Sequence, residues 1–212
     1  LFFSLEMPAS EIQDRMIASL SGLAMDDVIR KDAADINRIA DAVDELSAMP
    51  IWLEDEGDGS TAQLSLESIA AFVRLFAELY PDRQTVVLVD YLQRVRTKAR
   101  YEKRYELIGH VCKGLKDAAK QARVPIIVGA QLGRGVEQRG KNSAPQLSDL
   151  RESGDIETNA DQIVLFQRES EREFKFAVEK YRQGQRFVAR VAFDGPRCQF
   201  ADWLEAGETD WH

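Results

Sequence analysis

Cysteine and histidine are scarce in this sequence, with two of each among 212 residues. Cys112 and Cys198 are far apart in the chain, and no cluster of Cys and His has the spacing of metal ligands. We therefore expect no zinc centre and no catalytic histidine, and we expect a reduced, cytoplasmic protein. Apolar runs approaching about 18 residues are also absent, so the sequence predicts no membrane-spanning helix and no membrane partner.

Basic residues are scarce outside residues 94–151. The formal net charge is −8, which for the whole chain argues against nucleic-acid binding. Residues 94–151, however, carry 14 Lys and Arg against 5 Asp and Glu, whereas residues 1–93 carry 6 against 18. A basic middle between acidic ends predicts one surface that binds an anion, although ordinary solvated helix faces account for part of the excess.

A short apolar strand is predicted within the segment TVVLVDYLQ, residues 85–93. Its four consecutive apolar residues suggest a strand buried on both faces, as in a parallel sheet. Asp90 follows at the carboxyl end, where such sheets bind their ligands. A carboxylate there suits a Mg²⁺–nucleotide site, because Mg²⁺ takes one or two carboxylates plus phosphate oxygens and water. The alternative is a strand-terminal Asp that caps a turn, and the motif alone favours neither role.

The order of predicted elements is that of an α/β protein. Strands alternate with amphipathic helices through residue 130, and three further strands follow, the last two alternating apolar and polar residues as antiparallel edge strands do. We therefore predict a mostly parallel central sheet flanked by helices, with an antiparallel C-terminal extension. The predicted strands are residues 1–5, 50–53, 85–89, 125–130, 160–168, 174–181 and 187–193.

Polar residues suited to nucleotide hydrolysis follow four of these strands. They are Glu6, Asp90, Gln131 and the pair Lys180 and Arg182. One acid can polarise water, one can hold Mg²⁺, the amide can sense a γ-phosphate, and the cations can offset charge in the transition state. The set is the inventory of an NTPase site.

Two loops in the basic region are candidates for binding a nucleic-acid backbone. Residues 94–104 contain six basic side chains and one acidic one, directly after the Asp90 strand. We expect this segment to be a mobile loop at the functional edge of the sheet. Its candidate DNA-binding residues are Arg94, Arg96, Lys98 and Arg100, and a second loop over residues 133–146 adds Arg134 and Arg139.

Six segments of the chain match the motifs of a known family. They are FFSLEM (2–7), VDYLQ (89–93), GLKDAAKQARVPII (114–127), QLGRGVEQR (131–139), LSDLRESGDIETNAD (147–161) and EKYRQG (179–184). With these motifs the chain resembles the C-terminal, RecA-like motor domain of hexameric replicative DNA helicases of the DnaB family. VDY is shared by many RecA-like ATPases, whereas DLRESG followed by I-E-x-x-A-D is specific. The resemblance covers residues 1–200, and residues 201–212 are expected to form an acidic tail.

The resemblance implies a role for each matched residue. Glu6 is expected to be the general base that orients the attacking water, and Asp90 the Walker B acid that holds Mg²⁺. Gln131 is expected to couple the γ-phosphate to the DNA loops. The other implied residues are Lys180 and Arg182 as a cationic finger pair acting on the neighbouring subunit's nucleotide, Arg168 as a nucleotide-binding residue, and Arg151, Glu152 and Gly154 as a turn that grips single-stranded DNA.

The implied activity is ATP-dependent translocation on single-stranded DNA with unwinding of the duplex. ATP and Mg²⁺ are the implied cofactors, and the implied partners are single-stranded DNA, identical subunits in a hexameric ring, a primase and a helicase loader. Two alternatives are a non-catalytic RecA-like scaffold or partner-binding module, and a recombination- or clock-type RecA-like ATPase. The joint presence of all five strand-end residues argues against the scaffold, and DLRESG with QLGRGVEQR argues against the second.

Two departures from the family pattern affect these expectations. Gly133 stands where the family usually has Asn, which loosens a loop expected to contact DNA. No segment matches the phosphate loop G-x-x-x-x-G-K-[ST], so the sequence lacks its backbone amides and lysine. We therefore expect a fragment of a longer helicase that hydrolyses ATP poorly by itself.

Overall fold

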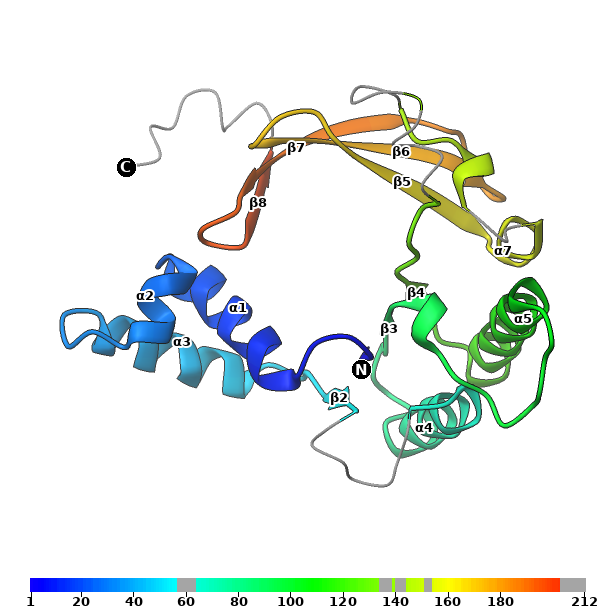
Figure 1. Ribbon diagram of the computed structural model, residues 1–212. Coiled ribbons are helices and arrows are strands. Elements are labelled where there is room, and N and C mark those ends of the chain that lie inside the picture. The colour runs from blue at the N-terminus through cyan, green and yellow to red at the C-terminus, as the bar shows by residue number, and fades with distance from the viewer. Residues whose placement is uncertain (57–63, 134–138, 140–143, 151–153, 203–212) are drawn as a thin grey trace. The chain divides into compact units, whose positions relative to one another are not determined.

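The computed structural model describes residues 1–56, 64–133, 139, 144–150 and 154–202. These residues fall into two compact units, one of Leu1–Ala9 and Ile51–Asp161 and the other of Ser10–Pro50 and Gln162–His212. Each unit contains one four-stranded sheet, parallel in the first and antiparallel in the second (Figure 1). The predicted parallel sheet with helices and the predicted antiparallel extension are both confirmed, and the antiparallel strands form a sheet of their own.

The parallel sheet has the strand order β2-β1-β3-β4. Its strands are β1 (Phe2–Ser4), β2 (Leu53–Asp55), β3 (Val87–Asp90) and β4 (Ile126–Val128). Each neighbouring pair is parallel, with Phe3 opposite Val89 and Val89 opposite Val128. All four strands therefore place their carboxyl ends at one edge of the sheet.

One face of the parallel sheet carries the core of this unit. Phe3, Val87 and Val89 are buried, and the ring of Phe3 lies edge-on to that of Phe72 with centroids 6.0 Å apart. The opposite face is open, because Leu88 is 39% exposed and Ile127 is 58% exposed. The prediction that residues 86–89 are buried on both faces is therefore wrong: a continuous apolar run does not reveal whether the second face is covered.

Two helices pack together in the first unit, α4 (Leu66–Leu79) and α5 (Arg104–Ala122). A reciprocal capping box between Ser65 and Ser68 starts α4. A Cβ on Gly114 of α5 would lie 2.6 Å from a methyl of Leu66, so the glycine permits the close approach of the two helices. Shorter elements complete this unit: η1 (Leu92–Arg94), η2 (Leu147–Asp149) and α7 (Gly154–Asn159), which lies against α5.

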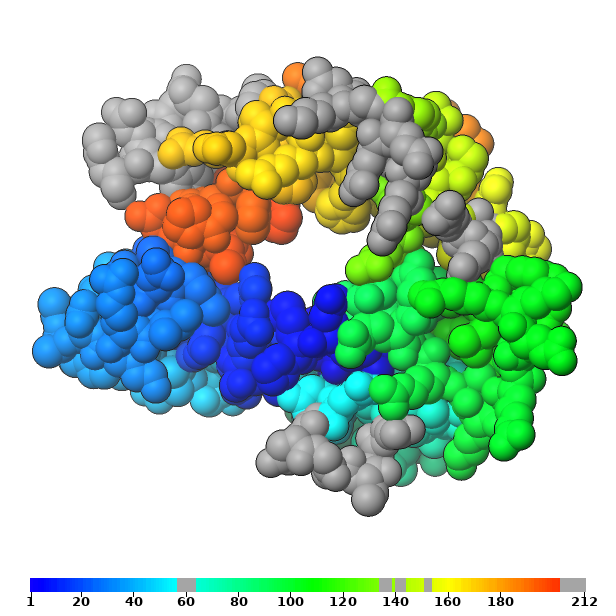
Figure 2. All heavy atoms as spheres, in the orientation of Figure 1, coloured from blue at the N-terminus to red at the C-terminus, as the bar shows by residue number. Residues whose placement is uncertain are grey.

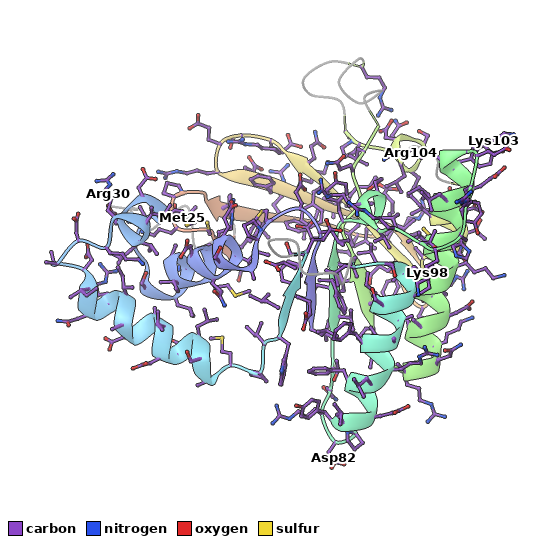
Figure 3. The ribbon with its side chains drawn as sticks, turned by 60° about the horizontal axis from the view of Figure 1, so that its bottom comes forward. Met25, Arg30, Asp82, Lys98, Lys103 and Arg104 are labelled. Atoms are coloured by element: carbon purple, nitrogen blue, oxygen red, sulfur yellow. The ribbon has the colours of Figure 1, made fainter. Side chains whose placement is uncertain are left out.

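The second unit begins with three helices, α1 (Ala9–Ser21), α2 (Met25–Arg30) and α3 (Ile36–Ala48). Their shared core consists of Ala18, Leu23, Val28 and Ile39. The blue spheres of these helices pack as one body in Figure 2. Figure 3 marks α2 by the labels on Met25 and Arg30. No helix in the described ranges is both long and apolar enough to cross a membrane.

The antiparallel sheet has the order β5-β6-β7-β8. Its strands are β5 (Gln162–Arg168), β6 (Glu173–Tyr181), β7 (Val188–Asp194) and β8 (Gln199–Asp202). The sequence did not predict β8, which continues two residues into the segment expected to be a tail. β6 and β7 were expected to be edge strands, but both are central: β6 lies between β5 and β7, and β8 pairs with the other side of β7, so β5 and β8 are the edges.

Candidate functional site

The carboxyl edge of the parallel sheet brings Glu6 and Asp90 together. β1 and β3 are neighbours, Ser4 is opposite Asp90, and the backbone N–H of Leu5 donates to the carbonyl oxygen of Asp90 at 2.8 Å. Glu6 follows Leu5 directly and is exposed, while Asp90 is partly buried. Each carboxylate thus lies at or just after the carboxyl end of a strand, as predicted from the sequence, and the structure shows that the two strands are neighbours.

The loop that carries Glu6 is held from both sides. The buried hydroxyl of Ser4 donates to the carbonyl of Met7 at 2.5 Å and accepts from its N–H at 3.3 Å. A carboxylate oxygen of Asp55, at the end of β2, accepts from the N–H of Ala9 at 2.6 Å. Sequence reasoning missed both supports. Asp55 lies in the acidic stretch of residues 54–59, which has the composition of a solvated turn. Its carboxylate is distinguished from the others by its hydrogen bond to the N-terminus of α1.

Gly129 lies against the carboxylate of Asp90, whose peptide bond to Tyr91 is cis. A Cβ on Gly129 would be 3.3 Å from Oδ1 of Asp90 and 3.5 Å from Cβ of Tyr91. A side chain at residue 129 would therefore crowd the carboxylate. The position of the Asp90 carboxylate depends on the absence of a side chain at the end of β4.

Gln131 follows β4 at the same edge of the sheet. The side-chain amide of Gln93 donates to the carbonyl of Gln131 and accepts from its N–H, both at 3.1 Å. Two residues further on, the N–H of Gly133 donates to the carbonyl of Asp149 at 2.7 Å. Glu6, Asp90 and Gln131 thus belong to one edge of one compact unit.

The basic segment after β3 is anchored rather than loose at residues 96–98. The carbonyl of Arg96 accepts from the N–H of Leu66 at 2.8 Å. The carboxylate of Glu67 accepts from the hydroxyl of Thr97 at 2.6 Å and from the N–H of Lys98 at 3.1 Å. The first turn of helix α4 therefore holds residues 96–98, and the mobility expected of the whole segment stays a prediction.

Hydrogen bonding keeps Glu67 ionised. Burial raises the pKa of its carboxyl, but hydrogen bonds from the Thr97 hydroxyl, from Ser65 and from the backbone amides of Glu67 and Lys98 outweigh burial and lower the pKa from 4.5 to about 2. A negative charge fixed beneath the basic segment is the anchor that the sequence pattern did not reveal.

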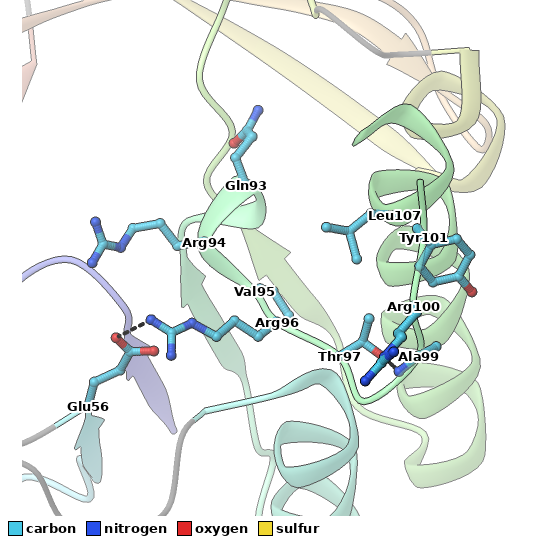
Figure 4. Close-up of a pocket in the computed structure, with 10 residues that line it drawn as sticks. All are labelled: Glu56, Gln93, Arg94, Val95, Arg96, Thr97, Ala99, Arg100, Tyr101 and Leu107. Carbon is cyan, nitrogen blue, oxygen red and sulfur yellow. Dashed lines mark hydrogen bonds and ion pairs between the residues drawn. The ribbon is translucent and has the colours of Figure 1, made fainter. Parts of the chain in front are cut away.

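An open groove of about 730 Å³ follows this segment. Its lining includes Arg94, Arg96, Arg100 and Tyr101, and a guanidinium nitrogen of Arg96 lies 3.9 Å from a carboxylate oxygen of Glu56. Figure 4 shows the side chains of Arg94 and Arg96 pointing to the same side. Figure 3 labels Lys98, Lys103 and Arg104 where the segment runs into α5. The groove combines cations with an aromatic ring, which suits a nucleic-acid backbone and its bases.

The second predicted DNA loop is described only in part. Arg139 forms an ion pair with the buried carboxylate of Asp149, which also accepts from the N–H of Gln146 at 2.7 Å. Gly154 is exposed and begins α7. The predicted residues Arg134, Arg151 and Glu152 lie outside the described residues.

The remaining predicted residues belong to the antiparallel unit. Arg168 ends β5, and its Nε donates to the carbonyl of Ser170 at 3.0 Å. Lys180 lies in β6 opposite Ile163, and Arg182 follows the end of that strand. The ring of Tyr181 lies against Gly184, where a Cβ would overlap it. The absence of a side chain at Gly184 thus leaves room for the Tyr181 ring, which lies in the chain between Lys180 and Arg182.

The family model described as the DnaB-like helicase C terminal domain matches residues 1–202 of the chain. The chain belongs to this family.

Relatives of this DnaB-like domain carry names from DNA replication. The replicative DNA helicase DnaB of Leifsonia xyli subsp. xyli is 34% identical over 95% of this chain, and a probable plasmid replicative DNA helicase of Chlamydia trachomatis is 34% identical over 94%. The chain covers 45% and 43% of these proteins, so it spans less than half the length of the curated relatives it matches.

Solved structures confirm the fold of the DnaB-like domain. A DnaB-like replicative helicase, studied with its interactions with primase, has a TM-score of 0.86 at 28% identity, covering 95% of this chain and 49% of that one. A second solved structure, described as an ATPase domain, gives the same TM-score and identity, with 95% and 74% coverage.

Proposed function

We propose that this domain is the motor of a replicative DNA helicase, in which ATP hydrolysis drives movement along single-stranded DNA and separation of the duplex. The observation that carries the proposal is the placement of Glu6 and Asp90 on adjacent strand ends, with Gln131 after the next strand of the same sheet. Family membership and the names of the relatives support it.

We assign proton transfer to Glu6 and phosphate sensing to Gln131. Glu6 is exposed at the sheet edge, where its carboxylate can accept a proton from an attacking water and orient that water. The side chain of Gln131 is exposed at the same edge and can donate a hydrogen bond to a γ-phosphate oxygen.

Asp90 fits a nucleotide-bound Mg²⁺. No group of three or more His, Cys, Asp or Glu residues in the described part of the chain is arranged to hold a metal by itself. One carboxylate at a strand end is nevertheless sufficient, because Mg²⁺ bound with a nucleotide keeps water and phosphate oxygens as its other ligands. Such an ion supplies charge neutralisation at the phosphates. Asp90 would hold it with its carboxylate positioned by Gly129.

Single-stranded DNA is the proposed polymer in the groove beside Tyr101. Arg94, Arg96 and Arg100 can each neutralise a backbone phosphate, and Tyr101 can stack on a base. Because the groove begins directly after the strand that ends in Asp90, a change at the nucleotide has a short path to the DNA.

A ring of identical subunits is the proposed assembly. Lys180 and Arg182 would act in trans on the neighbouring subunit's nucleotide and offset the charge of its transition state, with Arg168 as a further nucleotide contact. A hexamer, a primase partner and a loader are proposed on the same basis, as is a location in the cytoplasm with the replicating DNA. A primase is named for one solved relative.

A non-catalytic scaffold is the second candidate, because no segment of this chain matches the phosphate-loop motif. One comparison separates the two. Turnover of ATP should be measured for this chain and for the full-length protein, each with and without single-stranded DNA, alongside unwinding of a forked duplex. The helicase proposal expects DNA-stimulated turnover and unwinding by the full-length protein. Absence of both in the full-length protein would leave the scaffold.

A further inference from the structure

The side chain of Gln93 makes two hydrogen bonds to the Gln131 backbone of the kind that a neighbouring strand would make. Hydrogen bonds between β3 and β4 continue beyond the strands, because the N–H of Gly129 donates to the carbonyl of Val89 at 2.9 Å and the N–H of Leu92 donates to that of Gly129 at 2.8 Å. There the chain turns into η1. The next pair of hydrogen bonds joins the Gln93 side chain to the Gln131 backbone, both at 3.1 Å.

Glutamine is chemically suited to this position. A primary amide has a donor and an acceptor side by side, as a backbone peptide does, and can therefore satisfy the N–H and the carbonyl of one residue together. Both bonds go to the backbone of Gln131, and the side chain of Gln131 is exposed at the sheet edge. The contact fixes the backbone of Gln131 and leaves its side chain able to reach a phosphate.

Gln93 also stands at the start of the basic segment. Arg94 follows it directly, and Arg96 lies two residues beyond Arg94 in the lining of the same groove. The segment is anchored at its far side by Glu67, through Thr97 and Lys98. The Gln131 backbone is thus joined through Gln93 to a short span of chain that ends at the Glu67 anchor.

We propose that Gln93 is a positioning residue that couples Gln131 to the groove-lining arginines, so that occupancy of the groove by single-stranded DNA sets the position of Gln131 and raises ATP turnover. This coupling rests on the proposed helicase function. It requires the paired hydrogen bonds, and packing of a side chain of similar size does not replace them.

Three variants of the full-length protein separate hydrogen bonding from packing. Gln93→Met keeps the length of the side chain and removes both hydrogen bonds, and Gln93→Glu keeps the acceptor for the Gln131 N–H while placing an oxygen against the Gln131 carbonyl. Gln121→Ala is the matched control, because Gln121 is an exposed glutamine in α5 of the same unit. For each protein, kcat and KM for ATP are measured across a titration of single-stranded DNA, together with the melting temperature.

The coupling role predicts a selective loss. Gln93→Met and Gln93→Glu should both lower kcat at saturating DNA about tenfold, while KM for ATP stays within about twofold and the melting temperature within a few degrees. Gln121→Ala should match the wild type. DNA-stimulated turnover by Gln93→Met equal to the wild type overturns the coupling role and leaves the helicase function standing. A lower kcat accompanied by a raised KM and a lowered melting temperature also overturns the coupling role, in favour of a purely structural one. A wild type that DNA does not stimulate overturns the helicase function and the coupling together.

Discussion

Oδ1 of Asp90 lies 3.3 Å from the point that a Cβ on Gly129 would occupy. That distance is shorter than an ordinary van der Waals contact, so any side chain at residue 129 must displace the carboxylate. The position of the acid that we assign to Mg²⁺ therefore depends on Gly129, which directly follows the neighbouring strand β4 and has no side chain.

Substitution of Gly129 should weaken the use of Mg²⁺. Gly129→Ala pushes the Asp90 carboxylate by a few tenths of an ångström, and we expect the Mg²⁺ concentration for half-maximal ATP turnover to rise by about threefold to tenfold. Gly195→Ala is the control, since a Cβ there would meet only Phe193 at 3.7 Å. An unchanged Mg²⁺ dependence in Gly129→Ala would show that Asp90 does not hold the ion.

Glu67 should make a pH-dependent contribution to stability. Its folded-state pKa of about 2 lies below the usual 4.5, so the carboxylate stabilises the fold fully above about pH 4.5 and less as the pH falls toward about 2. Glu67→Gln should lower the free energy of unfolding by about 1–2 kcal/mol at pH 7. Thermal melts should show the gap from wild type closing as the pH falls through this window. Glu78→Gln, at an exposed position of the same helix, should change little. A gap for Glu67→Gln that is independent of pH would contradict the anchoring role.

Gly184 should be needed for the placement of Arg182, which lies in the turn after β6, and not for folding of the sheet. Gly184→Ala places a methyl group against the Tyr181 ring, which must shift, and Tyr181 lies in the chain between Lys180 and Arg182. We expect ATP turnover by the assembled protein to fall about tenfold or more with nucleotide binding retained, because the cations act on the transition state. Gly195→Ala again serves as the control. Full turnover in Gly184→Ala would argue against a role for this turn.

Mixing two inactive variants tests whether Arg182 acts in trans. Asp90→Asn disables a subunit's own Mg²⁺ site and leaves its Arg182, whereas Arg182→Ala does the reverse. If Arg182 serves the neighbouring subunit, mixed rings contain some complete sites, and turnover should exceed that of either variant alone. A mixture no more active than the separate variants would place Arg182 in its own subunit's site.

Local patterns predicted the elements of this fold better than the contacts between them. The strand ends at Glu6, Asp90 and Gln131 were predictable because parallel strands with short apolar runs bring their carboxyl ends to one edge. β8 was missed because QFAD is short and lies next to an acidic segment, and without β8 the prediction left β7 at an edge of that sheet. Leu88 is exposed although it lies in a continuous apolar run. Whether the second face of a strand is buried depends on what covers the sheet, and the apolar run does not show this.

The supports of the site were the least predictable part. Ser4, Asp55, Glu67 and Gln93 act through hydrogen bonds to backbone atoms, and for the last three these partners are distant in sequence. A backbone partner carries no side-chain signature, so a single sequence cannot reveal these pairings. The roles of the catalytic and DNA-binding residues remain predictions that rest on the family's motifs.

The measurement that bears most directly on the account is the ATP turnover of the full-length protein carrying Glu6→Gln. The account predicts normal binding of a nucleotide analogue and a loss of DNA-stimulated kcat of about 100-fold or more, since the general base is removed. Glu11→Gln, which removes only a surface pair with Arg15, should behave as the wild type. Turnover by Glu6→Gln close to that of the wild type would make Glu6 an ordinary strand-end acid and contradict the proposed site.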